Sequence, residues 1–251
     1  MLPILRAACL ALAGLLAAGC LSSRQEADGP GPQPAPSESF GAFRATLTLL
    51  VEPPKRERVT LTARVFRDRA GRVAVTLAKV DHDLVVAVLA EGRLACLLPR
   101  SGSAGAVYEG PASAPGLPPL LAHLDVLAAE IGDGPVPQAP VLDQGAWRLA
   151  QGPWRARLRA DARGLREKAL LDAGGEVALR VLYADPVPLG GVPRPAKATL
   201  HVADGTVITV VPGSASAEPD VAARRFRLPP AADGAARVDA RGLVDAFADM
   251  D

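Results

Sequence analysis

Hydrophobic and polar residues alternate with a period of two from Phe40 onward. In residues 43–51 the odd positions are apolar and most even positions are polar. The same alternation returns in residues 59–65 and 73–77, on either side of the turn-forming Asp-Arg-Ala-Gly sequence at residues 68–71. A strand that buries one of its faces needs this pattern. The three segments therefore predict the beginning of an antiparallel meander.

Similar alternation continues through most of the chain. It predicts further strands at residues 84–90, 93–98, 147–150, 154–160, 165–171, 177–183, 196–202 and 206–211. Short turns rich in glycine and aspartate separate several of these segments. About a dozen strands at this spacing predict a mainly β fold, in which a curved antiparallel sheet forms an incomplete, half-open barrel. Connections this short exclude a parallel α/β fold, which needs crossover helices.

Residues 116–131 depart from the strand pattern. Their apolar side chains recur at spacings of three and four, and prolines are tolerated in the first turn of a helix. The helical positions are Leu117, Leu120, Leu121, Leu124, Leu127, Ala128 and Ile131. The segment predicts an amphipathic helix that caps the barrel, and its leucines either form a lid over the hollow side or fill the end of the barrel as core. A second helix is expected within residues 239–250.

The first 19 residues have the pattern of an export signal. A short region ending at Arg6 precedes the apolar run of residues 7–18, which is shorter than the roughly 20 residues needed to span a bilayer. The run ends in Leu16-Ala17-Ala18-Gly19-Cys20, which resembles the lipobox of bacterial lipoproteins. The resemblance implies that residues 1–19 are removed and that Cys20 is lipidated. The alternative is an ordinary signal peptide beside an incidental cysteine.

Residues 20–39 predict a tether between this cysteine and the strands. The segment is rich in proline and glycine and has almost no apolar side chains to bury, so we expect it to be disordered. Residues 40–251 then form a single β domain. Of the 3 cysteines, Cys9 is lost with the signal and Cys20 is acylated, so Cys96 has no partner for an internal disulfide. Its apolar surroundings in residues 94–98 predict a small buried hydrophobic side chain.

Charge and motif content exclude several functional classes. Lys and Arg number 28 against 27 Asp and Glu, and aromatic residues make up 4% of the chain, whereas nucleic-acid binding favours a basic face with stacking aromatics. The histidines at positions 82, 123 and 201 lack the spacing of a helical metal pair. Neither a nucleophile elbow nor a phosphate-binding loop is present. We therefore expect no catalytic site, no metal and no cofactor.

Taken together, these features resemble the LolA/LolB-like superfamily of lipoprotein carriers and receptors. The resemblance rests on the lipidated cysteine, the tether, the strands that begin at Phe43-Arg44-Ala45-Thr46-Leu47, the leucine-rich helix and the late Phe226-Arg227-Leu228-Pro229-Pro230. It implies an incomplete barrel capped by helices, with an apolar cavity for acyl chains. The receptors of this family present an exposed apolar residue on a loop between early strands. Here the connection Asp81-His82-Asp83 is short and polar, so direct transfer of lipoproteins is not implied.

The shortage of bulky side chains also favours a cavity. A curled sheet lined by Val, Leu and Ala does not easily fill a wide interior, which leaves space for a ligand. The alternative is that the same residues pack on one another and exclude any ligand. If the cavity is open, the expected lining consists of Leu47, Leu49, Val59, Leu61, Val73, Val75, Leu77, Leu120, Leu121, Leu124 and Leu127.

The sequence thus predicts a lipid-anchored envelope protein that binds acyl chains of lipids or lipoproteins and has a role in their localisation. By analogy with lipoprotein sorting in Gram-negative bacteria, Leu21 after the cysteine favours the periplasmic face of the outer membrane. The expected partners are acyl chains and, through the anchor, the membrane. The alternative function is a non-catalytic envelope scaffold whose surface docks a protein partner.

Overall fold

The structure is a computed structural model of the 251-residue chain. It describes residues 31–80, 82–100, 103–151, 154–229 and 234–248. The signal segment, Cys20 and residues 21–30 lie outside the described part, so the lipidation of Cys20 stays a prediction.

Strands dominate the described chain. The first group comprises β1 (Phe43–Glu52), β2 (Val59–Arg67), β3 (Val73–Lys79), β4 (His82–Ala90), β5 (Arg93–Arg100) and β6 (Ser103–Pro111). The second comprises β7 (Val141–Asp143), β8 (Ala146–Gln151), β9 (Trp154–Asp161), β10 (Gly164–Leu171), β11 (Val177–Tyr183), β14 (Ala198–Val202) and β15 (Val207–Ala217). The short strand β16 (Ala236–Arg237) joins the first group, and β12 (Pro186–Leu189) with β13 (Val192–Pro195) forms a separate hairpin.

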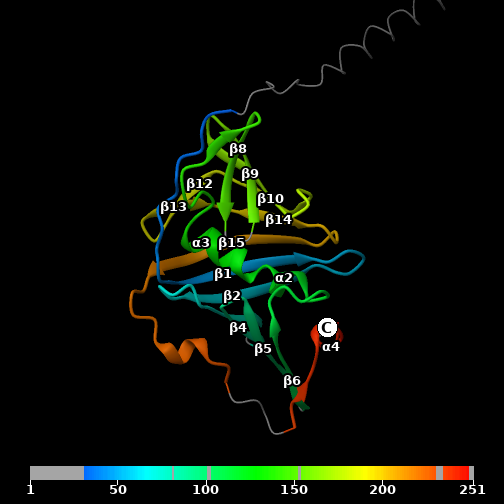
Figure 1. Ribbon diagram of the computed structural model, residues 1–251. Coiled ribbons are helices and arrows are strands. Elements are labelled where there is room, and N and C mark those ends of the chain that lie inside the picture. The colour runs from blue at the N-terminus through cyan, green and yellow to red at the C-terminus, as the bar shows by residue number, and fades with distance from the viewer. Residues whose placement is uncertain (1–30, 81, 101–102, 152–153, 230–233, 249–251) are drawn as a thin grey trace, which may run out of the picture.

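A single 14-stranded sheet joins the two groups through β1 and β15. Its order is β16-β6-β5-β4-β3-β2-β1-β15-β14-β11-β10-β9-β8-β7. Neighbouring strands are antiparallel except β16 and β6, and five of the pairings contain a register shift that bends the sheet. The sheet is strongly curved and does not close (Figure 1). This confirms the predicted mainly β fold with an incomplete antiparallel barrel.

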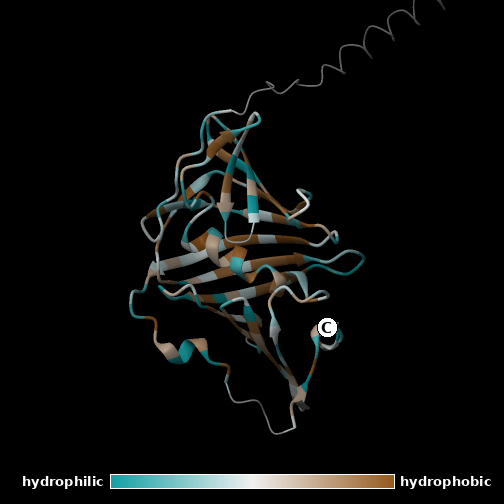
Figure 2. Cartoon of the chain, in the orientation of Figure 1, coloured by the Kyte–Doolittle hydropathy of each residue, from teal (hydrophilic) through white to brown (hydrophobic). Residues whose placement is uncertain are grey.

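The alternation seen in the sequence corresponds to the two faces of the sheet. In β1 the side chains of Phe43, Ala45, Leu47 and Leu49 are buried, while the polar residues between them are exposed. Hydrophobic and hydrophilic bands alternate along the strands in the same way (Figure 2). The inward residues form one continuous core that includes side chains from both groups of strands.

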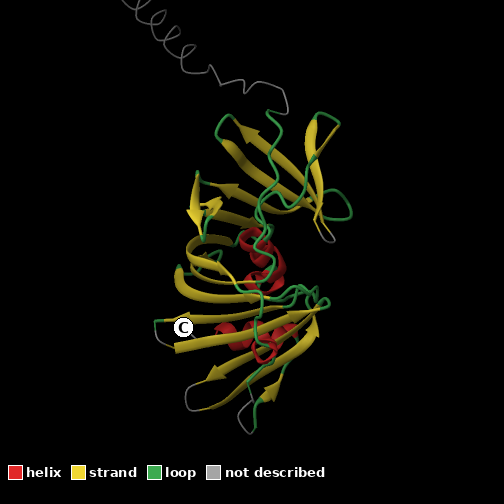
Figure 3. Ribbon diagram, turned by 90° about the vertical axis from the view of Figure 1, so that its left-hand side faces the viewer, coloured by secondary structure: helices red, strands yellow, loops and turns green. Residues whose placement is uncertain are grey.

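The helices lie against the hollow side of the sheet (Figure 3). They are α2 (Pro119–Ala122), α3 (Leu124–Gly132) and the C-terminal α4 (Ala240–Ala248). The predicted single helix at residues 116–131 is therefore wrong in one respect, because it is divided at His123. The backbone angles of this residue, φ −116° and ψ 23°, do not continue either helix. The expected C-terminal helix is present as α4.

Several strands of the structure were not predicted from the sequence. No strand was predicted between residues 98 and 116, but β6 (Ser103–Pro111) pairs there with β5. Small residues such as Gly105 and Ala106 carry too weak an alternation to indicate a strand, and it is the adjacent strand that holds them extended. The same explanation applies to the short strands β7, β12, β13 and β16.

The end of the expected tether packs on the domain. Ser37 donates a backbone hydrogen bond of 2.7 Å to Val136 O, and Gln33 Nε2 donates one of 3.2 Å to Pro140 O. Phe40 N bonds to Gly132 O at the end of α3. Ser37 and Phe40 thus have backbone partners on the domain although the segment is poor in apolar side chains, a contribution that composition does not reveal.

Candidate ligand cleft

Helix α3 packs tightly over β1, β2 and β3. Its apolar face meets inward side chains of these strands, and the gap that remains has a volume of about 10 Å³. Leu47, Leu49, Val75, Leu77, Leu124 and Leu127 border this gap. A void of that size holds at most one water molecule. The sheet beneath α3 is therefore filled core in this structure.

An open cleft lies at the neighbouring end of the sheet, beside α2. Its volume is about 520 Å³, within the range of about 300–1,000 Å³ that is typical of ligand pockets. The walls come from the ends of β1 to β4, from residues 116–120 and from Val244 of α4. Aliphatic side chains and prolines form most of this lining: Val51, Pro53, Pro54, Val59, Leu61, Leu77, Leu84, Val85, Leu117, Pro118, Pro119 and Leu120.

The structure divides the predicted lining residues between the cleft and the core. Val59, Leu61, Leu77 and Leu120 line the open cleft. Leu47, Leu49, Val75, Leu124 and Leu127 lie beneath or on α3 at the small gap. Val73 and Leu121 are buried in the core and border neither space. Contact of any of them with a ligand stays a prediction.

Sequence reasoning missed the loop residues of the cleft. The β1–β2 connection contributes Pro53, Pro54, Arg56 and Glu57, and the turn before β15 contributes Asp204. The sequence indicates them only indirectly, because an antiparallel order of the predicted strands brings these turns to the same end of the sheet. Together with Lys79, the charged side chains give the apolar cleft a rim of both signs.

The hairpin between β3 and β4 presents an apolar side chain to solvent. Val80 is 84% exposed, and its φ is 57°. A β-branched residue rarely adopts a positive φ, a conformation that costs roughly 1–3 kcal/mol. The neighbouring Lys79 lines the cleft, which places this tip at its rim. The expected polar connection Asp81-His82-Asp83 is therefore wrong in its bounds, because Val80 belongs to the turn and β4 begins at His82.

A buried polar cluster attaches α3 to the second group of strands. Glu130 of α3 forms an ion pair with Lys168 of β10 and accepts a hydrogen bond of 2.8 Å from the Tyr183 hydroxyl of β11. Lys168 is fully buried, and its Nζ also donates to Pro135 O at 2.9 Å and to Gln151 Oε1 at 3.0 Å. Burial, followed by the charge of Glu130 and the hydrogen bond to it, raises the pKa of Tyr183 well above its usual range. The tyrosine therefore acts as a donor to the carboxylate.

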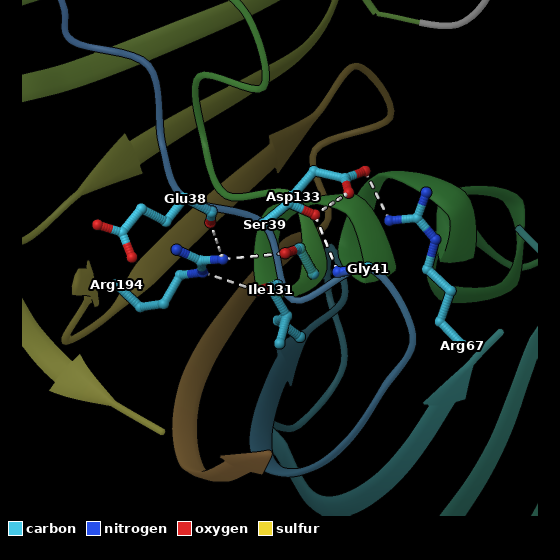
Figure 4. A network of polar contacts seen from close by, with 8 residues as sticks. Glu38, Ser39, Gly41, Arg67, Ile131, Asp133 and Arg194 are labelled. Atoms are coloured by element: carbon cyan, nitrogen blue, oxygen red, sulfur yellow. Dashed lines mark hydrogen bonds and ion pairs between the residues drawn. The ribbon is translucent and has the colours of Figure 1, made fainter. Parts of the chain in front are cut away.

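Arg194 of β13 binds the end of α3. The side chain is 1% exposed, and its Nε and Nη2 donate to the carbonyl oxygens of Ile131 at 2.7 Å and Gly132 at 2.9 Å. Nη2 also donates to Glu38 O at 2.6 Å, so the same guanidinium holds the N-terminal segment (Figure 4). A cation at this position complements the negative end of the helix dipole. Burial lowers the pKa of Arg194, while the charges of Asp133, Glu38 and Glu130 oppose this shift.

Asp133 extends this network to the first group of strands. Its carboxylate accepts a hydrogen bond of 2.6 Å from Arg67 Nη1 of β2 and one of 3.0 Å from Ser39 Oγ (Figure 4). Beside it, Gly132 lies against the ring of Phe43, where a Cβ atom would overlap the ring. The C-terminal end of α3 is thus fastened by polar groups from several elements, while Leu124 at its N-terminal end makes apolar contacts at the small gap.

His123 marks the break between α2 and α3. Its ring lies against that of Trp154, with 6.4 Å between the centroids, and its Nδ1 is buried without a hydrogen-bond partner. Burial lowers the pKa of His123 against the opposing charges of Asp125 and Asp204. The imidazole is therefore neutral at neutral pH, which agrees with its role as a packing group at the break.

Cys96 is fully buried in the core, as the sequence predicted. Burial raises the pKa of its thiol to about 12, so almost none of it is the reactive thiolate at neutral pH. We expect a water-soluble thiol reagent to modify Cys96 only as fast as the protein opens. Modification of the chain from Leu21 onward, followed by mass spectrometry, should be slow in buffer and immediate in urea. Rapid labelling without urea would contradict this burial.

The described residues contain no cluster of His, Cys, Asp and Glu side chains that could hold a metal ion. None of the helices in the described part of the chain is long and apolar enough to cross a membrane.

No protein-family model matches the chain, and no curated protein matches it significantly. Among solved structures, a LolA superfamily protein from Nitrosomonas europaea matches with a TM-score of 0.47 and 11% identity, over 78% of this chain and 92% of that one. A DUF1329 family protein from Desulfovibrio piger matches with a TM-score of 0.47 and 7% identity, over 74% and 90%. A putative outer membrane lipoprotein-sorting protein domain from Vibrio parahaemolyticus matches with a TM-score of 0.49 and 8% identity, over 76% and 91%. The structural neighbours of this chain thus include a protein of the superfamily that its sequence resembles.

Proposed function

We propose that the chain is a lipid-anchored envelope protein that binds acyl chains of lipids or lipoproteins in the cleft beside α2. The observation that carries this proposal is the cleft itself, which has a volume of about 520 Å³ and aliphatic walls. Each methylene that leaves water contributes about 0.8 kcal/mol, so a flexible hydrocarbon chain gains affinity from such walls without needing specific hydrogen bonds. The mixed charges at the rim would face the polar end of the ligand.

The position of the cleft also agrees with a carrier role. It is open to solvent at one end and continues toward the packed core beneath α3, where Leu77 borders both the cleft and the small gap. Val80 stands at its rim, where an exposed apolar tip could enter a membrane surface. Acylation of Cys20 and a location in the outer membrane belong to this proposal and rest on the export signal and the lipobox.

A substitution that fills the cleft tests this proposal. Val59 is half-buried and lines the cleft, so a tryptophan there should occupy the space of the ligand. For the chain from Leu21 onward, we expect Val59→Trp to weaken binding of dansyl-labelled undecanoic acid about tenfold or more, because loss of even a few methylene contacts amounts to over 1 kcal/mol. Fluorescence titration gives the dissociation constant.

Thr60 provides the matched control. It is the next residue of β2 and is exposed on the opposite face of the strand, so Thr60→Trp adds the same ring outside the cleft. Binding by this variant should equal that of the unchanged chain. If the unchanged chain does not bind the probe, or if both tryptophan variants bind it equally well, the cleft is not an acyl-chain site.

A further inference from the structure

The described C-terminal elements lie on both faces of the sheet near its β6 edge. After β15, the 3₁₀ helix η1 (Ala223–Phe226) lies on the outer face, where Phe226 packs with Ala74 and Val88. Arg72 stacks over the Phe226 ring at 4.7 Å. Strand β16 then pairs in parallel with the edge strand β6, and α4 follows on the inner face. In Figure 1, η1 is drawn in orange and α4 in red beside the C-terminus.

Two adjacent residues of helix α4 contact the core and the cleft. Leu243 is fully buried and belongs to the inner core, while Val244 is 37% exposed and forms part of the cleft wall. Arg241 and Asp245, on the other side of the helix, are exposed. Helix α4 therefore adds the aliphatic side chain of Val244 to the cleft wall, and Leu243 packs the helix on the core.

The attachment of α4 differs from that of α3. Helix α3 is held by the buried Glu130–Lys168 pair and by Arg194, whereas no side chain of α4 that the structure describes makes an ion pair or hydrogen bond to the sheet. Its polar bonds are local: Asp239 Oδ1 accepts from Gly242 N at 2.7 Å, and Leu243 N donates to Asp239 O. The lead-in β16 has only two residues, followed by a bond from Val238 N to Val107 O. Apolar contact of this kind is not directional and can be replaced by the methylenes of a ligand.

We propose that α4 is a displaceable stopper of the cleft. In the closed state Val244 forms part of the cleft wall while Leu243 covers core side chains, and release of α4 from the inner face exposes this apolar surface to an acyl chain and enlarges the site. The tie to β16 keeps the released helix close, so that it competes as an intramolecular ligand. This inference rests on the proposed function, because it names the segment that regulates the same cleft.

The direct test removes the stopper. For the chain from Leu21, which contains every described residue, deletion of residues 239–251 should tighten binding of dansyl-labelled undecanoic acid about tenfold, as expected when a site is open for about one tenth of the time unaided. Leu243→Gln in the otherwise intact chain should change affinity in the same direction, and it decides the matter if the deletion fails to fold. Arg241→Gln, on the exposed side of the same helix, is the matched control and should leave binding unchanged.

A reversible disulfide tests whether α4 leaves while β16 stays paired. Arg237 and Val107 are register partners in β16 and β6, so Arg237→Cys with Val107→Cys can link the two strands. Because only α4 has to leave the inner face, we expect the oxidised form to bind the probe with the affinity and rate of the unchanged chain, and slower binding by it would contradict release of α4 alone. Equal affinities for the unchanged chain, the deletion and Leu243→Gln would overturn the stopper and leave the acyl-chain cleft standing. A complete absence of probe binding, including to the deletion variant, would overturn both proposals.

Discussion

Lys168→Met is expected to lower the free energy of unfolding by about 3–5 kcal/mol, because it leaves the carboxylate of Glu130 buried without its cation. Lys168 is fully buried and Glu130 is 7% exposed, so solvent cannot replace the missing partner. The substitution also removes the donor to Pro135 O and Gln151 Oε1. Urea unfolding followed by circular dichroism measures the change for the chain from Leu21 onward.

Two further variants identify the cause. Glu130→Gln in the Lys168→Met background removes the unpaired charge while keeping a carbonyl oxygen for the Tyr183 hydroxyl, and it should recover a large part of the loss. Lys197→Met, at an exposed position, should change stability by less than about 0.5 kcal/mol. A Lys168→Met protein as stable as the Lys197→Met control would show that the pair is not formed in the folded chain.

Arg194→Met is expected to cost about 2–4 kcal/mol and to loosen the N-terminal segment. The guanidinium satisfies the buried carbonyl oxygens at the end of α3, and an unsatisfied buried acceptor costs roughly 1–3 kcal/mol. The same substitution removes the bond to Glu38 O and the stacking of Arg194 over the Phe40 ring, at 5.0 Å. Urea unfolding gives the stability, and hydrogen exchange should show earlier exchange of the Ser37 and Phe40 amides.

Arg194→Lys separates charge from geometry. Lysine keeps the positive charge but cannot span several carbonyls with a planar fork, so it should recover only part of the stability. Arg69→Met, at an exposed turn position, is the control for loss of an arginine and should leave both readouts unchanged. Fast exchange limited to residues far from α3 in the Arg194→Met protein would argue against the network in Figure 4.

The sequence predicts the sheet well because inward and outward positions differ in chemistry. Alternation such as Leu47-Thr48-Leu49 identifies a strand without knowledge of its partner, since the pleat sends successive side chains to opposite faces. Strand β6 was not predicted, because its small residues are held extended by β5 and not by their own preference. The helix break at His123 was not predicted, because the leucine periodicity continues across it.

Hydrophobic periodicity does not predict the polar contacts that attach α3 to the strands. Lys168 lies in a strand whose pattern gives no indication that an ammonium group is buried, and its partner Glu130 is on a different element. Arg194 stands between two prolines and gives no sign that it reaches the end of α3. Such pairings depend on which strands become neighbours in space, which the hydrophobic pattern of one chain does not specify. Of the predicted lining residues, Val59, Leu61, Leu77 and Leu120 border the cleft, and loop residues at the sheet end supply much of the rest of its wall.

The docking of residues 31–40 determines how far a membrane anchor would let the domain travel. If Cys20 carries the lipid, the leash between the anchor and the domain ends at Gly31 and not at Phe40, because Gln33 and Ser37 are bonded to the loop after α3. Fully extended, that leash reaches roughly 40 Å, about half of the reach that the whole proline-rich stretch would allow. A shorter leash raises the local concentration of the domain at the bilayer surface. Arg194, by holding Glu38, would then help to set the working distance between the protein and its membrane.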